Sequence, residues 1–500
     1  MTDHGTVDVA VIGGGVNGAG IARDAAGRGL SVLLCEKGDL AEGTSSRSGK
    51  LVHGGLRYLE YYEFRLVREA LIEREVLLRA APHIIWPMRF VLPHSPEQRP
   101  AWMVRTGLFL YDHLGGRKML PGSRKLDLRR APEGRAIKPE YTTAFEYSDC
   151  WVDDARLVVL NALDAQERGA TILTRTAATS ARRGEDGLWT LTLKGADGTA
   201  SSVRARALVN SAGPWVEDVV GRVAGRNTSY RVRLVKGSHI VVPKFWEGPQ
   251  AYLFQNDDKR VIFVNPYEGN LCLIGTTDIP YTGKPEDATI DQAEIDYLLR
   301  VVNRYASKPL TQADIVHAFS GVRPLYDNNA EANASAVTRD YVFEVDDPEG
   351  QPPLLSVFGG KITTFRKLAE HALDRLAKTF PAMGKAWTAD AVLPGGDLPG
   401  ADFPAFLKAL EAAYPWLPRD LAEHYAHLYG TRARQLLGDA RSVADLGRHH
   451  GALLYGREVD FLRATEWAVT PADVLTRRTK HGLHLSADER RDFERAMEPA

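Results

Sequence analysis

The feature that most constrains the fold of this chain is a glycine-rich turn near its N-terminus. Residues 7–12 (VDVAVI) have the composition of a short buried strand, and the following GGGVNGAG places Gly13, Gly15 and Gly18 in GxGxxG spacing. A helical segment follows, and then a second strand that ends at Glu36. In such a unit the first glycine permits the turn, the second admits a pyrophosphate and the third lets helix and strand pack closely. The sequence therefore predicts a dinucleotide at the helix N-terminus, with its ribose on Glu36.

Two later stretches favour FAD over NAD as that dinucleotide. In ARALVNSAGPWVEDVV a strand ends at Ala212 and Gly213, and a helix is expected to begin at Pro214. In SVFGGKITTFRKLAEHAL a strand runs into Gly359 and Gly360 before another helix. Each later turn taken alone is also compatible with an ordinary helix start. Three such turns together suit a long ligand, whose flavin end would lie at the last helix N-terminus.

The chain has 500 residues, too many for one hydrophobic core, so we expect several domains. Recurrent strand–helix patterns indicate a discontinuous Rossmann-like α/β domain. Short β-rich runs between its parts indicate an α+β domain with an antiparallel sheet, and the residues after a Gly/Pro-rich linker read as helices. The expected ranges are 1–80, 150–225 and 325–380 for the nucleotide domain, 81–149 and 226–324 for the substrate domain, and 390–500 for the helical domain.

Charge and cysteine content exclude several classes of protein. The formal net charge is -1, from 63 basic and 64 acidic residues, so no basic field would attract nucleic acid. Three scattered cysteines make a disulfide framework or a thiolate metal site improbable, and the histidines lack ligand spacing, so no metal is expected. No apolar run long enough to span a membrane and no signal-like N-terminus is apparent, so a cytoplasmic protein is expected.

The motifs together resemble one family, the FAD-dependent, quinone-linked glycerol-3-phosphate dehydrogenases within the D-amino-acid-oxidase-like flavoproteins. The match is carried in order by VIGGGVNGAGIARDAAGRGLSVLL, GTSSRSGKLVHGGLRYLEYYEFRLVREALIEREVLL, PMRFVLPH, FEYSDCWVDDARL, LVKGSHIVVP, IGTTD, SGVRPL, TRDY and SVFGGKITTFRKLAEHALDRL. The resemblance implies oxidation of sn-glycerol 3-phosphate to dihydroxyacetone phosphate, with electrons passed through FAD to a membrane quinone. It also implies a homodimer attached to the inner face of the cell membrane.

The resemblance also assigns site residues. Arginine and lysine suit the dianionic substrate, because a guanidinium makes paired hydrogen bonds to phosphate. His239 is the expected base, although a lone histidine on an apolar strand is often structural. Expected at the substrate, with His239, are Arg57, Tyr58, Thr276, Arg323, Arg339 and Lys361. Expected at FAD are Gly13, Gly15, Asn17, Gly18, Glu36, Thr44, Ser45, Ser46, His53, Gly54, Gly55, Ala212, Gly213, Trp215, Gly359, Gly360, Lys361 and Thr363.

Three rival functions remain open at this point. An oxidase of the same fold would pass electrons to O2 and release H2O2, and an amine or amino-acid oxidase would bind a carboxylate instead of a phosphate. A flavoprotein with a structural FAD that binds RNA is disfavoured by the balanced charge. Several arginines around one pocket favour the phosphate, so the dehydrogenase is the preferred interpretation.

Two segments are candidates for contact with a lipid surface. The stretch RPAWMVRTGLFLYDHLGGRK (99–118) has aromatic and apolar residues, among them Trp102, Leu108 and Phe109, between arginines and lysine. The helix expected over residues 363–378 places apolar residues, including Phe365, on one side and basic residues elsewhere. Either segment would equally suit the protein core or a dimer interface.

Overall fold

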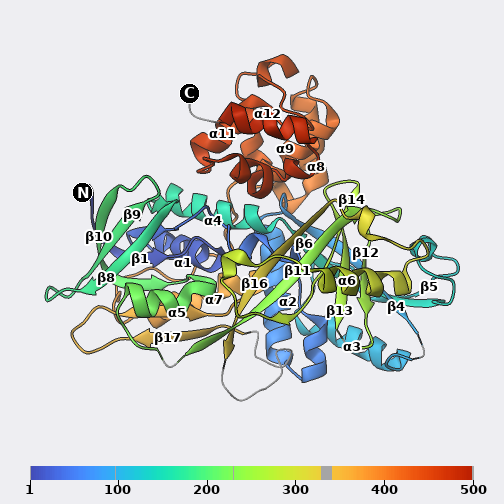
Figure 1. Cartoon of the computed structure of the whole chain (residues 1–500), viewed down its shortest axis with the longest axis horizontal. Coiled ribbons are helices and arrows are strands. Elements are labelled where there is room, and N and C mark those ends of the chain that lie inside the picture. Colours follow the sequence, from blue (N-terminus) through green and yellow to red (C-terminus); the bar gives the residue numbers. More distant parts are fainter. Residues whose placement is uncertain (1, 96, 229, 259, 328–339, 498–500) are drawn as a thin grey trace.

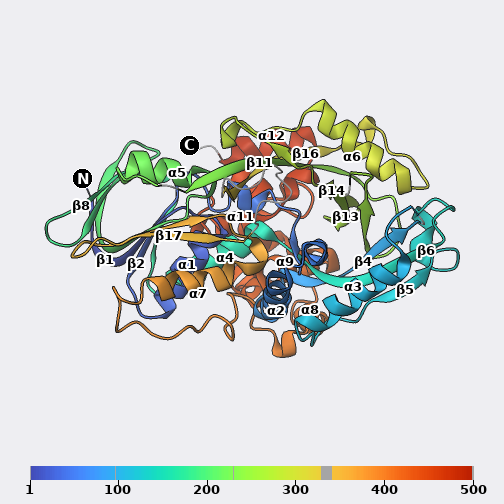
Figure 2. The same ribbon diagram turned by 90° about the horizontal axis from the view of Figure 1, so that it is seen from below.

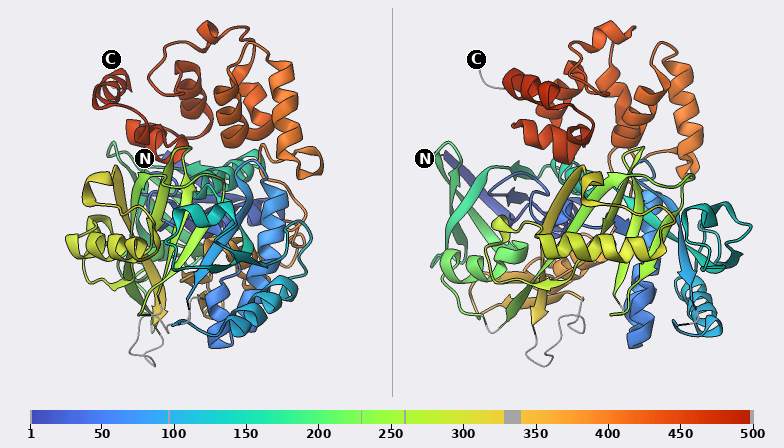
Figure 3. Two further views of the ribbon diagram at one scale, coloured as in Figure 1. Left: turned by 90° about the vertical axis from the view of Figure 1, so that its right-hand side faces the viewer. Right: turned by 45° about the vertical axis from the view of Figure 1, so that its right-hand side comes forward.

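The structure is a computed structural model that describes residues 2–95, 97–228, 230–258, 260–327 and 340–497 (Figure 1). Two lobes that each contain a sheet lie side by side, and the C-terminal helices lie across one side of both (Figures 1 and 3). The first lobe is built on a mainly parallel sheet and the second on a mainly antiparallel one. The predicted fold class, Rossmann-like with an antiparallel-sheet part and a helical C-terminal part, is confirmed.

The first sheet has the strand order β17-β18-β10-β1-β2-β7, with β9 and β8 continuing from β10. Its strands are β1 (Thr2–Ile12), β2 (Val32–Cys35), β7 (Thr171–Leu173), β8 (Thr176–Arg183), β9 (Trp189–Gly195), β10 (Ala200–Asn210), β17 (Val342–Asp346) and β18 (Leu354–Phe358). Neighbours from β18 through β10, β1 and β2 to β7 are parallel. Their carboxyl ends therefore meet at one edge, where α/β sheets bind ligands.

Helices α1 (Val16–Gly27), α4 (Asp154–Glu167) and α7 (Phe365–Arg375) pack together on one face of this sheet (Figure 2). Their apolar side chains and those of the strands form one buried core. The short α5 (Val216–Asp218) lies across the other face. The chain after β10 forms a continuous helical segment of a 3₁₀ turn (Gly213–Trp215), α5 and a π-helical turn (Val219–Val223), so the helix expected from Pro214 is present.

The second sheet has the order β15-β11-β14-β13-β12-β4-β6-β3, with β16 beside β11 and β5 beside β6. Its strands are β3 (Leu51–Val52), β4 (Ile85–His94), β5 (Arg124–Asp127), β6 (Thr143–Val152), β11 (Arg231–Pro243), β12 (Ala251–Gln255), β13 (Val261–Tyr267), β14 (Leu271–Gly275), β15 (Ile279–Pro280) and β16 (His317–Asp327). Helix α6 (Gln292–Tyr305) covers one face. The side chain of Asp291 caps it in a capping box with Glu294, so the predicted N-cap is confirmed.

Two helices cover the opposite face of the second sheet, and one of them carries the first candidate segment for lipid contact. Helices α2 (Phe64–Ala80) and α3 (Ala101–Leu114) share a core with β4, β6 and β14. Leu108, expected to face lipid, is only 2 % exposed in this core. Phe365 and the other apolar residues of α7 are also buried, under α1, so the second candidate for lipid contact is wrong. An apolar stripe on a helix has the same period whether it faces lipid or core.

The C-terminal domain is built from α8 (Phe403–Ala413), α9 (Arg419–Tyr429), α10 (Ala433–Leu437), α11 (Gly456–Thr465) and α12 (Ala487–Met497). These helices enclose a hydrophobic core of their own. The C-terminal domain contacts α4, which lies at the top of the first lobe in the view of Figure 1 (see also Figure 3). Arg156 on α4 extends into this interface and donates to the carbonyl oxygen of Leu428 at 2.9 Å.

Candidate active site

The three glycines of the N-terminal turn differ in what a side chain would contact at each position. Gly13 has φ +112°, and a Cβ there would lie 2.6 Å from the carbonyl oxygen of Ser211. A Cβ on Gly18 would lie 1.9 Å from the carbonyl oxygen of Gly13, so both positions exclude a side chain by contact within the protein. A Cβ on Gly15 would meet only the Ser45 hydroxyl, at 3.2 Å. Gly15 therefore leaves the N-terminus of α1 open to a ligand, as a pyrophosphate requires.

The carboxyl edge of the first sheet brings the three glycine turns together. Asn17, in the first turn of α1, donates from Nδ2 to the carbonyl oxygen of Gly359 at 3.2 Å, although the two residues are 342 positions apart. The Oδ1 atom of Asn17 is buried and has no hydrogen-bond partner within the described part of the chain. Gly359 and Gly360 have φ of +78° and +105°, which side chains disfavour. Ala212 and Gly213 lie beside this point, because β10 and β1 are neighbours.

Glu36 directly follows β2 at the same edge. Its Oε2 accepts from the backbone N–H of Gly14 at 2.6 Å and its Oε1 accepts from that of Gly38 at 2.8 Å. Burial raises the pKa of the Glu36 carboxyl, which those backbone donors oppose. The carboxylate thus holds the glycine turn in place and lies where a ribose would meet it.

The loop after β2 packs against the same edge. The N–H of Val16 donates to the Ser45 hydroxyl at 3.0 Å, and the Thr44 hydroxyl donates to the carbonyl oxygen of Val322 at 2.6 Å. The carbonyl oxygen of Ser46 accepts from Lys50 Nζ at 3.1 Å. Farther along, Trp215 lies under the ammonium of Lys37, 3.7 Å from its ring centre. The Ser45 contact holds this loop at the start of α1, and the Thr44 contact joins the loop to β16 of the second sheet.

Gly54 and Gly55 are required by protein contacts that the sequence did not reveal. A Cβ on Gly54 would lie 2.4 Å from Leu71, and one on Gly55, which has φ +75°, would lie 2.3 Å from the ring of Tyr58. The preceding His53 donates its backbone N–H to the Thr363 hydroxyl at 3.2 Å. This contact joins the turn before Arg57 to the segment that leads into α7.

A cavity of about 170 Å³ opens beside this turn. Six of the residues predicted from the sequence line it, namely His53, Gly55, Arg57, Tyr58, Thr276 and Arg323. Gln255, Arg260 and Asp278 also line it. Of these, Gln255 and Arg260 lie in β12 and the turn before β13, where no sequence motif marks them. Only the pairing of β12 with β13 brings them to the cavity.

Three guanidinium groups give the cavity a positive lining. Arg57 Nε is buried and has no partner among residues that the structure describes, while its Nη2 lies 3.4 Å from the Tyr61 hydroxyl. Arg323 Nη2 donates to Asp278 at 2.9 Å and to the carbonyl oxygen of Thr277 at 3.1 Å. Arg260 is paired with Asp258 at 2.6 Å. An unpaired N–H beside two further cations is the arrangement that an anionic ligand satisfies.

The other predicted substrate residues lie around the cavity. Lys361 does not line the cavity, but its ammonium lies 4.0 Å from the ring centre of Tyr58, and Tyr58 does line the cavity. His239 is buried, is not among the lining residues, and stacks on Phe319 with ring centres 5.0 Å apart. Burial, with Lys50 and Arg323 nearby, lowers the pKa of His239 to about 3. Arg339 lies outside the described residues.

Comparison with known proteins fits this arrangement. A family model described as "FAD dependent oxidoreductase" matches residues 8–366, most of the chain. This chain belongs to the FAD-dependent oxidoreductases. A second model, described as "C-terminal domain of alpha-glycerophosphate oxidase", matches residues 386–496 of the oxidoreductase.

Similar proteins extend over nearly the whole oxidoreductase. A D-erythritol 1-phosphate dehydrogenase from Brucella abortus is 63% identical over 99% of this chain and 98% of its own. A glycerol-3-phosphate dehydrogenase from Pseudomonas aeruginosa is 56% identical over 96% of this chain and 93% of its own. A solved glycerol-3-phosphate dehydrogenase from Bacillus halodurans, complexed with FAD, has 26% identity and a TM-score of 0.75 over 98% of this chain and 93% of its own. The cofactor of the oxidoreductase is FAD.

The residues at the sheet edge fit that cofactor. Gly15 leaves the start of α1 open, and the buried Asn17 Oδ1 lacks a partner within the described ranges. Both features lie at the end of β1, where the oxidoreductase would hold the pyrophosphate. Glu36, at the end of the adjacent β2, lies where the adenosine ribose would bind.

We predict that Glu36→Ala weakens FAD binding about 10- to 100-fold, since a charge-assisted hydrogen bond contributes about 1.5–3 kcal/mol. The substrate KM of the flavin-loaded enzyme should change little, because Glu36 does not line the substrate cavity. The measurement is the FAD-to-protein ratio during dilution and dialysis. Glu349→Ala, which removes an exposed carboxylate, is the matched control. An unchanged ratio for Glu36→Ala would contradict the assigned ribose contact.

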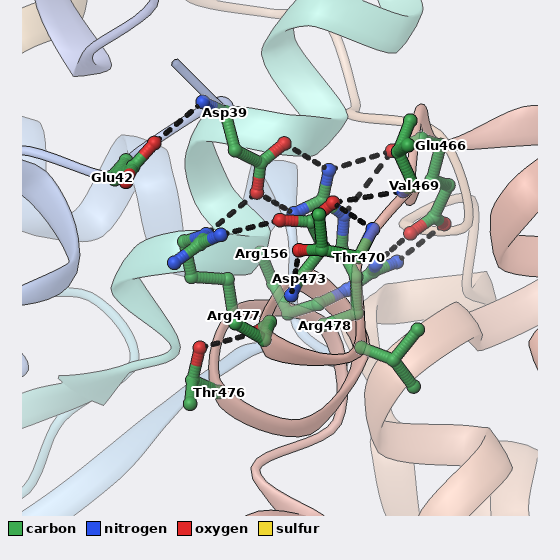
Figure 4. Close-up of polar contacts among 12 residues, drawn as sticks. Asp39, Glu42, Arg156, Glu466, Val469, Thr470, Asp473, Thr476, Arg477 and Arg478 are labelled. Carbon is green, nitrogen blue, oxygen red and sulfur yellow. Dashed lines mark hydrogen bonds and ion pairs between the residues drawn. The ribbon is translucent and has the colours of Figure 1, made fainter. Parts of the chain in front are cut away.

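A network of ion pairs attaches the loop after Glu36 to the C-terminal domain (Figure 4). The buried Asp39 accepts from Arg477 Nε at 2.6 Å and from Arg478 at 2.7 and 2.8 Å. Arg478 also donates to the carbonyl oxygen of Glu466 at 2.7 Å, and the Glu466 carboxylate pairs with Arg156. The C-terminal domain of the oxidoreductase therefore holds in place the loop that follows Glu36.

Proposed function

We propose that this chain oxidises sn-glycerol 3-phosphate to dihydroxyacetone phosphate. The observation that carries the proposal is the buried Nε of Arg57, which has no partner among the described residues, in a cavity also lined by Arg260 and Arg323. Glycerol 3-phosphate is a dianion of a size that such a cavity accommodates, and its phosphate accepts paired hydrogen bonds from guanidinium groups. The names of the Pseudomonas aeruginosa and Escherichia coli relatives, both glycerol-3-phosphate dehydrogenases, support the same substrate.

In the proposed reaction, Arg57 and Arg323 hold the phosphate while Tyr58, Thr276 and Lys361 flank the polyol chain. Arg339, which lies outside the described residues, is proposed as a further cation for the phosphate. When bound, FAD supplies an acceptor for the hydride that leaves C2. Holding the substrate in one orientation is the main contribution of these cations to the rate.

His239 is the proposed acceptor of the hydroxyl proton. Its Nδ1 is buried and unpartnered among described residues, and with a pKa of about 3 the ring is neutral at physiological pH. Burial and the neighbouring cations cause that low value, and a dianionic substrate bound to Arg323 would raise it. A substrate-dependent rise of this kind would give the ring the basicity that proton transfer needs.

D-erythritol 1-phosphate is a second candidate substrate. The observation that favours it is the 63% identity to the Brucella abortus D-erythritol 1-phosphate dehydrogenase, higher than the 56% to the Pseudomonas aeruginosa relative. Both compounds carry a phosphate and a secondary hydroxyl, so the same cations suit both. The test is to measure kcat/KM for the two compounds with one enzyme preparation. Glycerol 3-phosphate should have the higher value, and a clear excess for the four-carbon compound would assign that substrate instead.

We propose that the electrons pass to a membrane quinone rather than to O2. The relatives reported above are named dehydrogenases, which supports this acceptor. The alternative is an oxidase that releases H2O2. Turnover in air with and without a soluble quinone analogue separates them: fast quinone reduction with little peroxide fits the proposal, and stoichiometric peroxide fits the oxidase.

An exposed apolar surface next to the cavity supports peripheral attachment to the cytoplasmic membrane face. Trp102 and Phe109 on α3 are 66% and 59% exposed, and Tyr62 is 80% exposed. Tyr61, adjacent to Tyr62, lines the cavity itself. Arg105 lies on the same helix, α3, where it could meet lipid phosphates. Among the described residues, no helix is both long and apolar enough to cross a membrane.

We predict that replacing Tyr62, Trp102 and Phe109 by serine releases the enzyme from anionic vesicles at low salt. Aromatic burial at the interface drives the binding, so the variant should remain in the supernatant while the wild type pellets. The matched control replaces three exposed apolar residues elsewhere by serine, namely Val316, Val392 and Val469. Equal pelleting of both variants would show that this surface is not the anchor.

The two sheets and the helical C-terminus support a division into working parts. We propose an FAD-binding domain of residues 1–80, 150–225 and 325–380, a substrate domain of residues 81–149 and 226–324, and a helical domain of residues 390–500. A homodimer is proposed from the family resemblance. Sedimentation velocity of the purified holoenzyme measures the mass directly, and a monomer over the working concentration range would contradict it.

A further inference from the structure

Three polar side chains from separate segments of the C-terminal domain converge inside that domain. His424 lies on α9, Glu458 on α11, and His481 begins a 3₁₀ turn, His481–Leu483. The His424 Nε2 atom lies 2.8 Å from Glu458 Oε1 and 3.1 Å from His481 Nε2. All three potential ligand atoms lie within 4.8 Å of one another. Glu458 and His481 are buried, and the His424 side chain is only 10% exposed.

Hydrogen bonding alone satisfies this arrangement poorly. An imidazole nitrogen carries either one hydrogen or one lone pair. If His424 Nε2 carries the hydrogen and donates it to Glu458, it has no lone pair for His481. If it is the acceptor for His481, its lone pair faces the Glu458 carboxylate. With Glu458 ionised and no cation present, the three groups are linked only if one hydrogen is shared between two acceptors.

The surroundings of Glu458 add a second observation. Its Oε1 also accepts from the Tyr429 hydroxyl at 2.7 Å, whereas its Oε2 is buried with no hydrogen-bond partner in the described chain. The hydroxyl of Tyr425 is likewise buried and unpartnered there. A buried carboxylate with one unsatisfied oxygen is costly, and coordination to a cation removes that cost. The Tyr429 contact resembles the outer hydrogen bonds that orient metal ligands.

We propose that His424, Glu458 and His481 bind a divalent transition-metal ion, most suitably Zn²⁺. Two imidazole nitrogens and one carboxylate oxygen are typical Zn²⁺ ligands. Ligand atoms about 2.0–2.1 Å from a tetrahedral ion lie about 3.3 Å apart, close to the 2.8 and 3.1 Å that separate His424 Nε2 from Glu458 and His481. Three protein ligands leave a fourth position for water.

The bound ion would join α9, α11 and the turn before α12. Lys480, which directly precedes His481, is buried and pairs with Asp153, the N-cap of α4 in the first lobe. An ion at this place would therefore stabilise the C-terminal domain and its contact with the nucleotide-binding lobe. No step of the proposed oxidation passes through it.

The test uses the full-length holoenzyme. After purification without chelators, metal analysis should find about one Zn²⁺ per chain. After EDTA treatment the melting temperature should fall, and added Zn²⁺ should restore it. Co²⁺ added to the stripped enzyme should give the visible d–d absorption of a tetrahedral nitrogen and oxygen site, without thiolate charge transfer. The three cysteines are buried elsewhere, in the two lobes, so they supply no ligand.

Two conservative variants and one control assign the site. Glu458→Gln and His481→Asn should lose the bound metal and the response to EDTA while they keep FAD. His113→Asn, which changes an exposed histidine on α3, should retain one metal ion per chain. If the variants do not fold, the Co²⁺ spectrum of the wild type decides. A stripped wild type that binds neither Co²⁺ nor Zn²⁺, with a melting temperature indifferent to both, would overturn the proposal.

Discussion

Replacement of Arg323 by alanine is expected to lower kcat/KM for the phosphorylated substrate by about 10²- to 10⁴-fold, with FAD still bound. A guanidinium that makes two charged hydrogen bonds to phosphate contributes about 3–6 kcal/mol in total. Asp278 and the carbonyl oxygen of Thr277 hold Arg323 in the cavity, so its position is set before substrate arrives. Steady-state kinetics and the flavin spectrum measure both parts of this prediction.

The charge and the shape of Arg323 can be separated. Arg323→Lys keeps the charge but loses the planar fork, so its kcat/KM should lie between those of the wild type and the alanine variant. Arg233→Ala is the control, because Arg233 lies on the paired strand β11 and contacts Asp327 rather than the cavity. Loss of flavin from Arg323→Ala, or normal kinetics in the folded protein, would show that Arg323 is structural.

The second large effect is expected for Arg478→Ala. Arg478 is fully buried, and Asp39 accepts two of its hydrogen bonds (Figure 4). Removing one partner of a buried ion pair typically costs about 3–5 kcal/mol, because the remaining charge stays buried. Arg477 compensates for part of this loss, since it also contacts Asp39 at 2.6 Å. We therefore expect a lower melting temperature and, since Asp39 follows Glu36 closely, faster release of FAD.

Thermal unfolding followed by flavin fluorescence measures both consequences. Arg463→Ala on α11 is the control, because it removes an exposed arginine from the same domain. A melting temperature and a rate of FAD release equal to those of the control would show that the network in Figure 4 contributes little to either. A lower melting temperature with normal FAD retention would show that the network stabilises the contact between the domains but does not affect FAD binding.

The parts of the fold that depend on local pattern were predictable. The glycine spacing from Gly13 to Gly18 specifies a strand, a turn and a helix, because each glycine has its own steric requirement within a few residues. Asp291 was recognised as an N-cap for the same reason, since a cap acts within one turn. The structure confirms both elements.

The parts that depend on distant residues were not predictable. Gln255 and Arg260 reach the cavity through strand pairing, and Asp39 meets Arg478 across 439 positions. His424 and Glu458 are 34 positions apart, a spacing that signals no metal-binding motif. The prediction that α7 contacts lipid was wrong for another reason. The period of its apolar residues shows that one face of the helix is apolar, but it does not show what covers that face.

The most direct test of the proposed function is anaerobic titration of the purified yellow holoenzyme with glycerol 3-phosphate. The substrate should bleach the visible absorbance of the oxidised flavin, and dihydroxyacetone phosphate should form in equal amount. Glycerol, which lacks the phosphate, should leave the spectrum unchanged at the same concentration. If dithionite bleaches the flavin but neither glycerol 3-phosphate nor D-erythritol 1-phosphate does, the chain is not a dehydrogenase of these polyol phosphates.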